Sequence, residues 1–199
     1  MMIRVITGIV CAAAAYLFLA PSSVAATCEA VPGNAVSWWR GEFNARDSQG
    51  PNHGALMNGV TFAPGIVGCG FAFDGVDDMV VVNSTGVFKG QSEATIEAWI
   101  RPQGAHSNDD GFGGQIFGEN TGSADWTRFG LFSLNDGRII GFGRTGETGS
   151  SMSVTTTATT PIGEWSHVVA TWKTGDGLRV YLNGAEAAFL DDALVIGPP

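Results

Sequence analysis

The chain has 199 residues, with 10 Lys and Arg against 19 Asp and Glu, which gives a formal net charge of −9. Nucleic acids and anionic membrane surfaces attract basic proteins, and no run of Lys or Arg occurs, so the charge argues against both as partners. An acidic balance of this kind is typical of a soluble extracellular protein or of one that binds cations.

The first 26 residues have the pattern of a signal peptide. Arg4 precedes an apolar stretch over residues 5–20, and small residues at 23–26 suit the cleavage positions. An uncleaved membrane anchor is the alternative, but the stretch is short for a span and no second one follows. We therefore expect cleavage, a protein secreted to the extracellular space or the periplasm, and no membrane contact afterwards.

Cleavage would leave two of the three cysteines. Cys11 lies in the leader, Cys28 lies in a short extension over residues 27–33, and Cys69 lies inside the domain expected over residues 34–199. An even pair in an oxidising compartment predicts a disulfide between Cys28 and Cys69. Two unpaired thiols are the alternative.

The domain shows no helical periodicity, and its short apolar or alternating runs are separated by Gly, Asn and Asp, which indicates an all-β chain. Residues 70–82 predict a hairpin, because Phe71 and Phe73 alternate with small residues and Asp74-Gly75 supplies a turn before a β-branched run. Further strands are expected at 92–101, 114–118, 128–134, 138–142, 164–173 and 178–182. Turn residues at 135–137, 175–177 and 183–184 join several of them, so we expect two packed antiparallel sheets.

The strand at 94–101 divides its residues between two faces. The residues Ala94, Ile96, Ala98 and Ile100 share one face, which we expect in the core. The other face carries Thr95, Glu97, Trp99 and Arg101. On the strand at 164–173, His167 is expected to be a hydrogen-bonded histidine at the edge of the core.

Several segments, taken in order, resemble the laminin-G-like jelly-roll domains of the concanavalin A-like lectin and glucanase superfamily. They are residues 36–42, 45–48, 52–54, 62–68, 70–82, 94–101, 165–172 and 180–184. The resemblance covers about residues 34–196 and implies a two-sheet antiparallel jelly-roll sandwich. In the family a closing strand normally follows the one expected here at 194–197. Since the sequence stops at Pro199, we expect that strand to be missing and a sheet edge beside Trp38 and Trp39 to be open.

Acidic residues near the expected turns are candidate calcium ligands. Carboxylate oxygens on loops suit calcium, and many domains that the chain resembles hold a structural calcium near their ends. The predicted metal ligands are Asp47, Asp74, Asp77 and Asp78. The alternative is that these residues only form turns, because their spacing matches no known calcium loop.

A tryptophan in a polar loop is the best candidate for ligand contact. Indole rings stack on the apolar faces of sugars while nearby polar side chains bind hydroxyls. The predicted ligand-binding residues are Trp126, Asp125, Asn120 and Arg128. The alternative is that Trp126 covers the edge of the core.

Glu93 and Glu97 lie on one strand face, as the catalytic carboxylates of jelly-roll glucanases do. Those enzymes place a third carboxylate between the two, where this chain has Thr95, so we expect no catalysis. The leading hypothesis is a secreted, non-catalytic module that binds carbohydrate or an extracellular partner. The alternatives are a glycoside hydrolase of the same fold and a structural module of a longer adhesin.

Overall fold

The computed structural model describes residues 2–5, 33–83, 87–88, 91–104, 114–120, 127–144 and 151–191, without the side chains of 2–5, 120, 127 and 128. These residues form strands, turns and connecting segments, which confirms the all-β prediction. Among them no helix is long and apolar enough to span a membrane.

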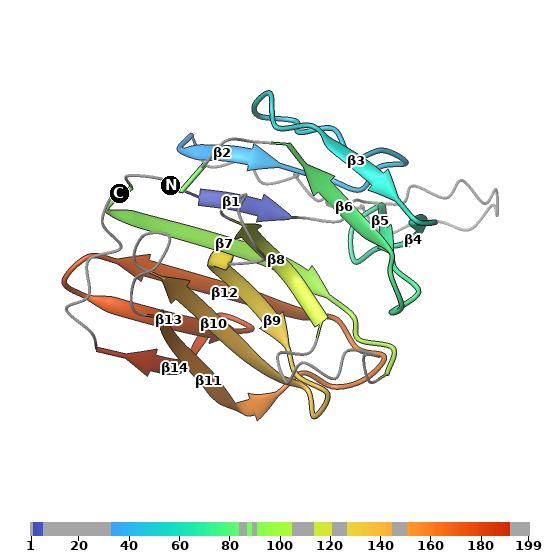
Figure 1. Ribbon diagram of the computed structural model, residues 1–199. Coiled ribbons are helices and arrows are strands. Elements are labelled where there is room, and N and C mark those ends of the chain that lie inside the picture. The colour runs from blue at the N-terminus through green and yellow to red at the C-terminus, as the bar shows by residue number, and fades with distance from the viewer. Residues whose placement is uncertain are drawn as a thin grey trace, which may run out of the picture.

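Two sheets and two short ribbons make up the fold, and all strand pairs except the two that involve β1 are antiparallel. The larger sheet has the order β14 (Ala185–Leu190), β13 (Gly177–Leu182), β12 (Ser166–Lys173), β7 (Glu93–Ile100), β1 (Met2–Val5) and β2 (Ala35–Trp38). The smaller sheet has the order β11 (Ser151–Thr159), β10 (Arg138–Arg144), β9 (Thr127–Ser133) and β8 (Gly114–Asn120). The ribbons pair β3 (Gly54–Met57) with β6 (Met79–Val82) and β4 (Thr61–Pro64) with β5 (Cys69–Ala72). Figure 1 shows the smaller sheet across one face of the larger one, which confirms the jelly-roll sandwich.

The core lies between the two sheets. Alternate residues of β7 and β12, among them Ile96 and Val168, are fully buried against Leu131 and Ile139 of the smaller sheet. The core face predicted for the strand at 94–101 is therefore confirmed, because period-two alternation directs Ala94, Ile96 and Ala98 inward.

The turns between neighbouring strands follow the expected residues. Between β13 and β14, Asn183 and Gly184 have φ angles of 50° and 83°, as the two-residue turn of a twisted hairpin requires. Residues 134–137 join β9 to β10, and residues 174–176 join β12 to β13. These connections confirm the antiparallel neighbours that the turn residues predict.

The hairpin predicted over residues 70–82 is wrong. Strand β5 pairs with β4, which places Phe71 opposite Phe62, and β6 pairs with β3, which places Val80 opposite Leu56. Hydrogen bonds inside residues 74–78 close a loop of their own, so the two strands separate instead of reversing onto each other.

Strand β1 lies inside the segment predicted to be the signal peptide. It is parallel to both neighbours, β2 and β7, and fills the position between them in the larger sheet. This arrangement therefore belongs to the uncleaved chain, and cleavage itself stays a prediction. The strand expected at 194–197 lies outside the described residues.

Candidate functional site

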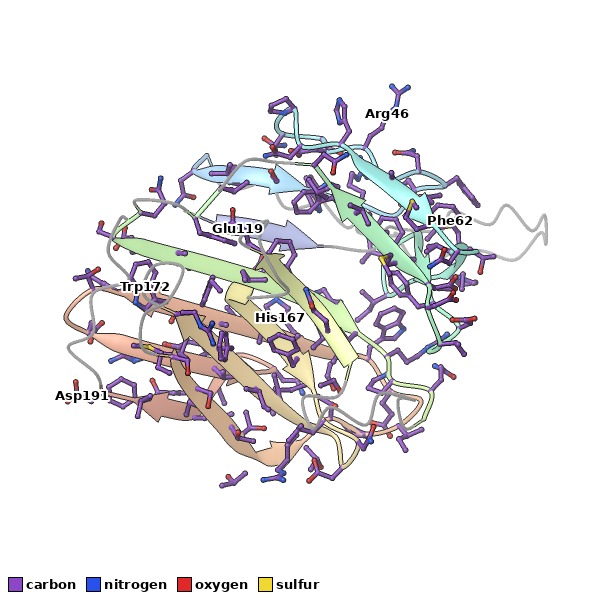
Figure 2. The ribbon with its side chains drawn as sticks, viewed as in Figure 1. Arg46, Phe62, Glu119, His167, Trp172 and Asp191 are labelled. Carbon is purple, nitrogen blue, oxygen red and sulfur yellow. The ribbon has the colours of Figure 1, made fainter. Side chains whose placement is uncertain are left out.

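The face of the larger sheet that turns away from the core carries aromatic and polar side chains. Because Ile96 and Val168 point inward, strand alternation places Glu97, Trp99 and His167 on the outer face. The pairing of β7 with β12 sets Trp99 opposite His167 and Glu97 opposite Val169. Figure 2 labels His167 and Trp172, which alternation places on opposite faces of β12.

His167 is the centre of a compact group. Its ring lies 5.0 Å from the ring of Trp99, with an interplanar angle of 34°. Its Nε2 lies 3.6 Å from Oε2 of Glu97, and the side chains of His167 and Glu97 are 24% and 6% exposed. The His167 backbone N–H donates to Oδ1 of Asn183 (2.9 Å), and the Asn183 N–H donates to the His167 carbonyl (2.8 Å). These bonds fix the backbone from which the imidazole projects.

Arg101 and Trp165 form a second pair, each two residues along the chain from Trp99 and His167. The Arg101 guanidinium lies 5.2 Å from the ring centre of the half-buried Trp165, a cation–π contact. We call Glu97, Trp99, Arg101, Trp165 and His167 the outer aromatic cluster. Flat rings beside a carboxylate, an imidazole and a guanidinium can stack on the apolar face of a sugar and bind its hydroxyls.

The ligand-binding residues predicted from the sequence flank a different part of the fold. Asn120 ends β8, Arg128 lies in β9, and Asn120 pairs with Thr127 across the ladder. Asp125 and Trp126 lie outside the described residues, so this set stays a prediction. The outer aromatic cluster was missed as a unit, although the shared face of Glu97, Trp99 and Arg101 is visible in the sequence.

Three of the four predicted metal ligands gather in one turn. One carboxylate oxygen from each of Asp74, Asp77 and Asp78 lies within 4.8 Å of the others. The Asp74 N–H donates to Oδ2 of Asp78 (2.9 Å), and the Val76 N–H donates to Oδ1 of Asp74 (2.9 Å). The Val76 bond is the main cause of a lowered pKa at Asp74. Oδ1 of Asp78 is buried and has no hydrogen-bond partner in the described part of the chain.

Asp47 lies outside that group and holds a loop together. Its Oδ1 accepts the N–H groups of Trp38 and Gln49 (both 2.9 Å), and its Oδ2 accepts the N–H of Asn52 (3.3 Å). Burial alone would raise the pKa of Asp47, but the bonds from Trp38 and Gln49 outweigh it and lower that pKa. The geometry therefore gives Asp47 a role in fixing the 47–52 loop to β2.

Cys69 is half-buried in β5, opposite Pro64, and is a free thiol in this structure. Cys28 lies outside the described residues. The Cys28–Cys69 bridge stays a prediction for the exported protein.

Glu93 and Glu97 have different surroundings despite sharing a face. Oε2 of Glu93 lies 3.7 Å from Nζ of Lys173, with both side chains 60% exposed. Glu97 is buried beside His167. The two carboxylates therefore differ in environment, one exposed beside a lysine and one buried beside a histidine.

A row of phenylalanines forms a second surface. Phe43, Phe62, Phe71 and Phe73 follow one another with ring-centre distances of 5.8, 5.7 and 6.1 Å. Phe43 is 72% exposed and has a φ of 56°, which is rare for an aromatic residue. The row consists of apolar side chains only.

A pocket at one end of the sandwich has a volume of about 80 Å³ and is lined by the turn at 134–137, by Pro102 and by Ile162. Binding cavities for drug-sized ligands measure about 300–1,000 Å³. This pocket has room for a few waters only, so it is too small for a ligand of that size.

The sequence profile of the Laminin_G_3 family, described as the concanavalin A-like lectin/glucanases superfamily, matches residues 74–193, more than half of the chain. The chain belongs to this superfamily. No curated protein matches the sequence significantly.

Two solved structures are similar to this chain at low sequence identity. The first is domain 4 of AbnA, a GH43 extracellular arabinanase from Geobacillus stearothermophilus, solved in complex with arabinotriose. Its sequence is 16% identical to this chain, the TM-score is 0.49, and the match covers 78% of this chain and 73% of that chain. The botulinum neurotoxin serotype G binding domain is 16% identical with a TM-score of 0.54 over 75% of this chain. The chain spans 37% of that second structure, and the likeness is one of fold.

Proposed function

We propose that this protein is a secreted, non-catalytic recognition module that binds carbohydrate through the outer aromatic cluster. The observation that carries the proposal is the packing of Trp99 against His167, with Glu97 3.6 Å from the imidazole. A half-buried ring for stacking lies beside groups that can donate and accept hydrogen bonds, on the outer face of the larger sheet. The superfamily includes lectins by description, which agrees with this chemistry.

A glycoside hydrolase is the less favoured alternative. Glu93 faces solvent beside Lys173, whereas Glu97 is buried beside His167, and Thr95 separates them on the face. Hydrolysis by a carboxylate pair needs both groups at one bond, one as acid and one as nucleophile or base. Release of reducing ends that disappears in Glu97→Gln would establish the hydrolase instead.

An extracellular protein partner is the second candidate, and the row of phenylalanines favours it. Phe43 and Phe73 are exposed at the ends of this row, with half-buried Phe62 and Phe71 between them. Contiguous exposed apolar side chains are typical of protein interaction surfaces. A structural module of an adhesin would use such a surface and would show no glycan selectivity.

A glycan array tests the carbohydrate proposal. The exported chain should bind a defined subset of glycans, and Trp99→Ala should weaken binding at least about tenfold, because the stacking ring is lost. Phe43→Ala is the matched control, since it removes an exposed aromatic ring elsewhere and should leave glycan binding within about twofold. Equal losses in both variants, or no bound glycan, would refute the assignment.

Calcium binding at residues 74–78 is a separate prediction. Calcium takes about six to eight oxygen ligands, and Asp74, Asp77 and Asp78 could supply carboxylates while carbonyls and waters supply the rest. A ligand that binds only the folded state stabilises it by about 2.7 kcal/mol at a hundred times its Kd. Adding calcium to the chelated protein should therefore raise the Tm by about 5 °C or more.

The matched variants for that measurement are Asp78→Asn and Asp136→Asn. Asp136 also lies in a turn, where it pairs with Arg138 at 2.7 Å, outside the acidic group. Calcium should no longer raise the Tm of Asp78→Asn and should still raise that of Asp136→Asn. A wild-type Tm that is the same with calcium and with chelator rejects the site.

A further inference from the structure

We propose that the row of phenylalanines, together with the turn at residues 74–78, is a docking surface for a protein segment that carries apolar side chains beside a Lys or Arg. We call residues 74–78 the acidic turn. The inference rests on the second candidate function, an extracellular protein partner, and is independent of carbohydrate binding. Figure 2 shows Phe62 well apart from His167, so the row and the outer aromatic cluster are separate surfaces.

Phe43 is held in an exposed position by a loop that is fixed on both sides of it. Phe43 is 72% exposed, and its φ of 56° costs free energy, so this conformation persists only where the surroundings hold it. Before it, Gly41 approaches β5 so closely that a Cβ would lie 3.0 Å from Cα of Gly70. After it, the Asn44 side chain accepts the Arg46 N–H (2.9 Å). An exposed ring that the fold holds in a strained conformation is typical of a binding residue.

The rings between the two ends of the row form its floor. The pairing of β4 with β5 sets Phe62 opposite Phe71, and both are half-buried. Phe73 at the other end is 52% exposed. Apolar side chains of a partner could therefore pack on the two half-buried rings, between the exposed rings of Phe43 and Phe73.

The acidic turn is attached directly to one end of the row, because Asp74 follows Phe73 in the chain. The carboxylate oxygens of Asp74, Asp77 and Asp78 that lie within 4.8 Å of one another concentrate negative charge there. The Asn58 side chain donates to the Asp77 carbonyl (2.7 Å), which ties the turn to the connection between β3 and β4. Like charges this close repel one another, and a cationic side chain relieves the repulsion. A Lys or Arg beside the apolar contacts is therefore the complement of this surface.

Charge distinguishes the candidate occupants of this surface. A second copy carries the same net charge of −9 and the same acidic turn, so long-range repulsion opposes it. An anionic membrane is repelled for the same reason. A segment of another protein with Lys or Arg beside its apolar side chains is attracted by the acidic turn and packs on the rings, so we assign the surface to it.

The probe for the test is a random twelve-residue peptide library displayed on phage and selected on the full chain in the presence of a chelator. Peptides that also bind Phe43→Ala are removed, so that the selection reports on the row. The retained peptides should carry apolar residues with a Lys or Arg close by. The best of them is then synthesised, together with a version in which Gln replaces each Lys and Arg. That Gln version should bind at least about tenfold more weakly.

Independent variants test both halves of the surface. Phe73→Ala, and Asp74→Asn combined with Asp77→Asn, should each weaken binding of the best peptide at least about tenfold. The matched controls are Phe189→Ala, which removes a 41% exposed residue from β14, and Asp136→Asn, which changes an exposed carboxylate of another turn. Both controls should stay within about twofold of the wild type. The double Asp variant should bind the peptide and its Gln version about equally, because the charge in which they differ has lost its partner.

Phe43→Gly separates recognition from folding. Glycine adopts a positive φ at no steric cost, and this relief offsets the lost packing of a mostly exposed ring. The variant should therefore keep the Tm of the wild type to within about 3 °C and still bind the peptide at least about tenfold more weakly. A Tm that falls further, together with the affinity, would mean that the ring only holds its own loop, and would overturn the proposal.

Four other results would overturn it. They are no retained peptide, retained peptides without Lys or Arg, a wild-type dimer in sedimentation that Phe43→Ala dissociates, and binding to phosphatidylcholine vesicles that Phe43→Ala abolishes. A glycan array with no bound glycan would refute the carbohydrate proposal and leave the peptide result unchanged, so failure of one proposal is distinguishable from failure of the other.

Discussion

Replacing Trp39 by alanine should lower the free energy of unfolding by about 3–5 kcal/mol, the usual loss for a large aromatic residue in a core. Trp39 is 5% exposed, and its ring lies 6.0 Å from that of Phe117. Its indole N–H donates to the Asn52 carbonyl at 2.7 Å. The substitution therefore leaves a cavity and an unpaired carbonyl where the N-terminal segment packs on the sandwich.

The neighbouring Trp38 is the matched control for this prediction. Trp38 points to the outer face, half-buried, with the Arg40 guanidinium 5.1 Å from its ring. Trp38→Ala should lower the free energy of unfolding by about 1 kcal/mol, the value of a partly exposed cation–π contact. Urea denaturation of both variants measures the difference, and equal losses would mean that the two indoles are assigned to the wrong faces.

Replacing Asp47 by alanine should lower the free energy of unfolding at pH 7 by about 3 kcal/mol, because three backbone N–H groups lose a charged acceptor. Asp136→Ala removes an exposed carboxylate of another turn. This control substitution should lower the free energy of unfolding by less than about 1 kcal/mol. The larger loss follows from burial, since water cannot easily replace the carboxylate of Asp47, which is 6% exposed.

The contribution of Asp47 should depend on pH in one direction. Its pKa is lowered in the folded protein, against burial, by the N–H groups of Trp38 and Gln49. Its stabilising effect is therefore complete above the unfolded-state pKa of about 3.9 and is lost as the pH falls through the lower folded value. The difference between wild type and Asp47→Ala should shrink below about pH 4. A difference that stays constant from pH 7 to pH 3 would contradict this account.

Much of the fold could be predicted from local pattern alone. Alternation in residues 94–101 identifies both faces of β7, and Asn183-Gly184 identifies the turn between β13 and β14. Strand β11 was not predicted, because its Ser and Thr residues give no apolar alternation even though Met152 and Thr156 are buried. The hairpin error at residues 70–82 has a different origin, since local sequence cannot tell which strand is the partner of β5.

Less of the candidate site could be predicted from local sequence pattern. The group of Trp99 with His167 depends on the register between β7 and β12, which are far apart in the chain. A register shift of one residue would send His167 to the core and Val168 outward. The acidic turn at Asp74, Asp77 and Asp78 is local, and the sequence located it, but the same reasoning included Asp47, whose carboxylate binds its own loop.

The most direct test of the carbohydrate proposal is NMR mapping of the isotope-labelled exported chain, titrated with the glycan that binds it best. The proposal predicts the largest shifts at the indole N–H groups of Trp99 and Trp165 and at the amides around Glu97 and His167. It also predicts small shifts at Asn120 and Arg128, which flank the loop that contains Trp126. Shifts confined to residues 120–128, with Trp99 and His167 unchanged, would contradict the account and place the binding site in that loop.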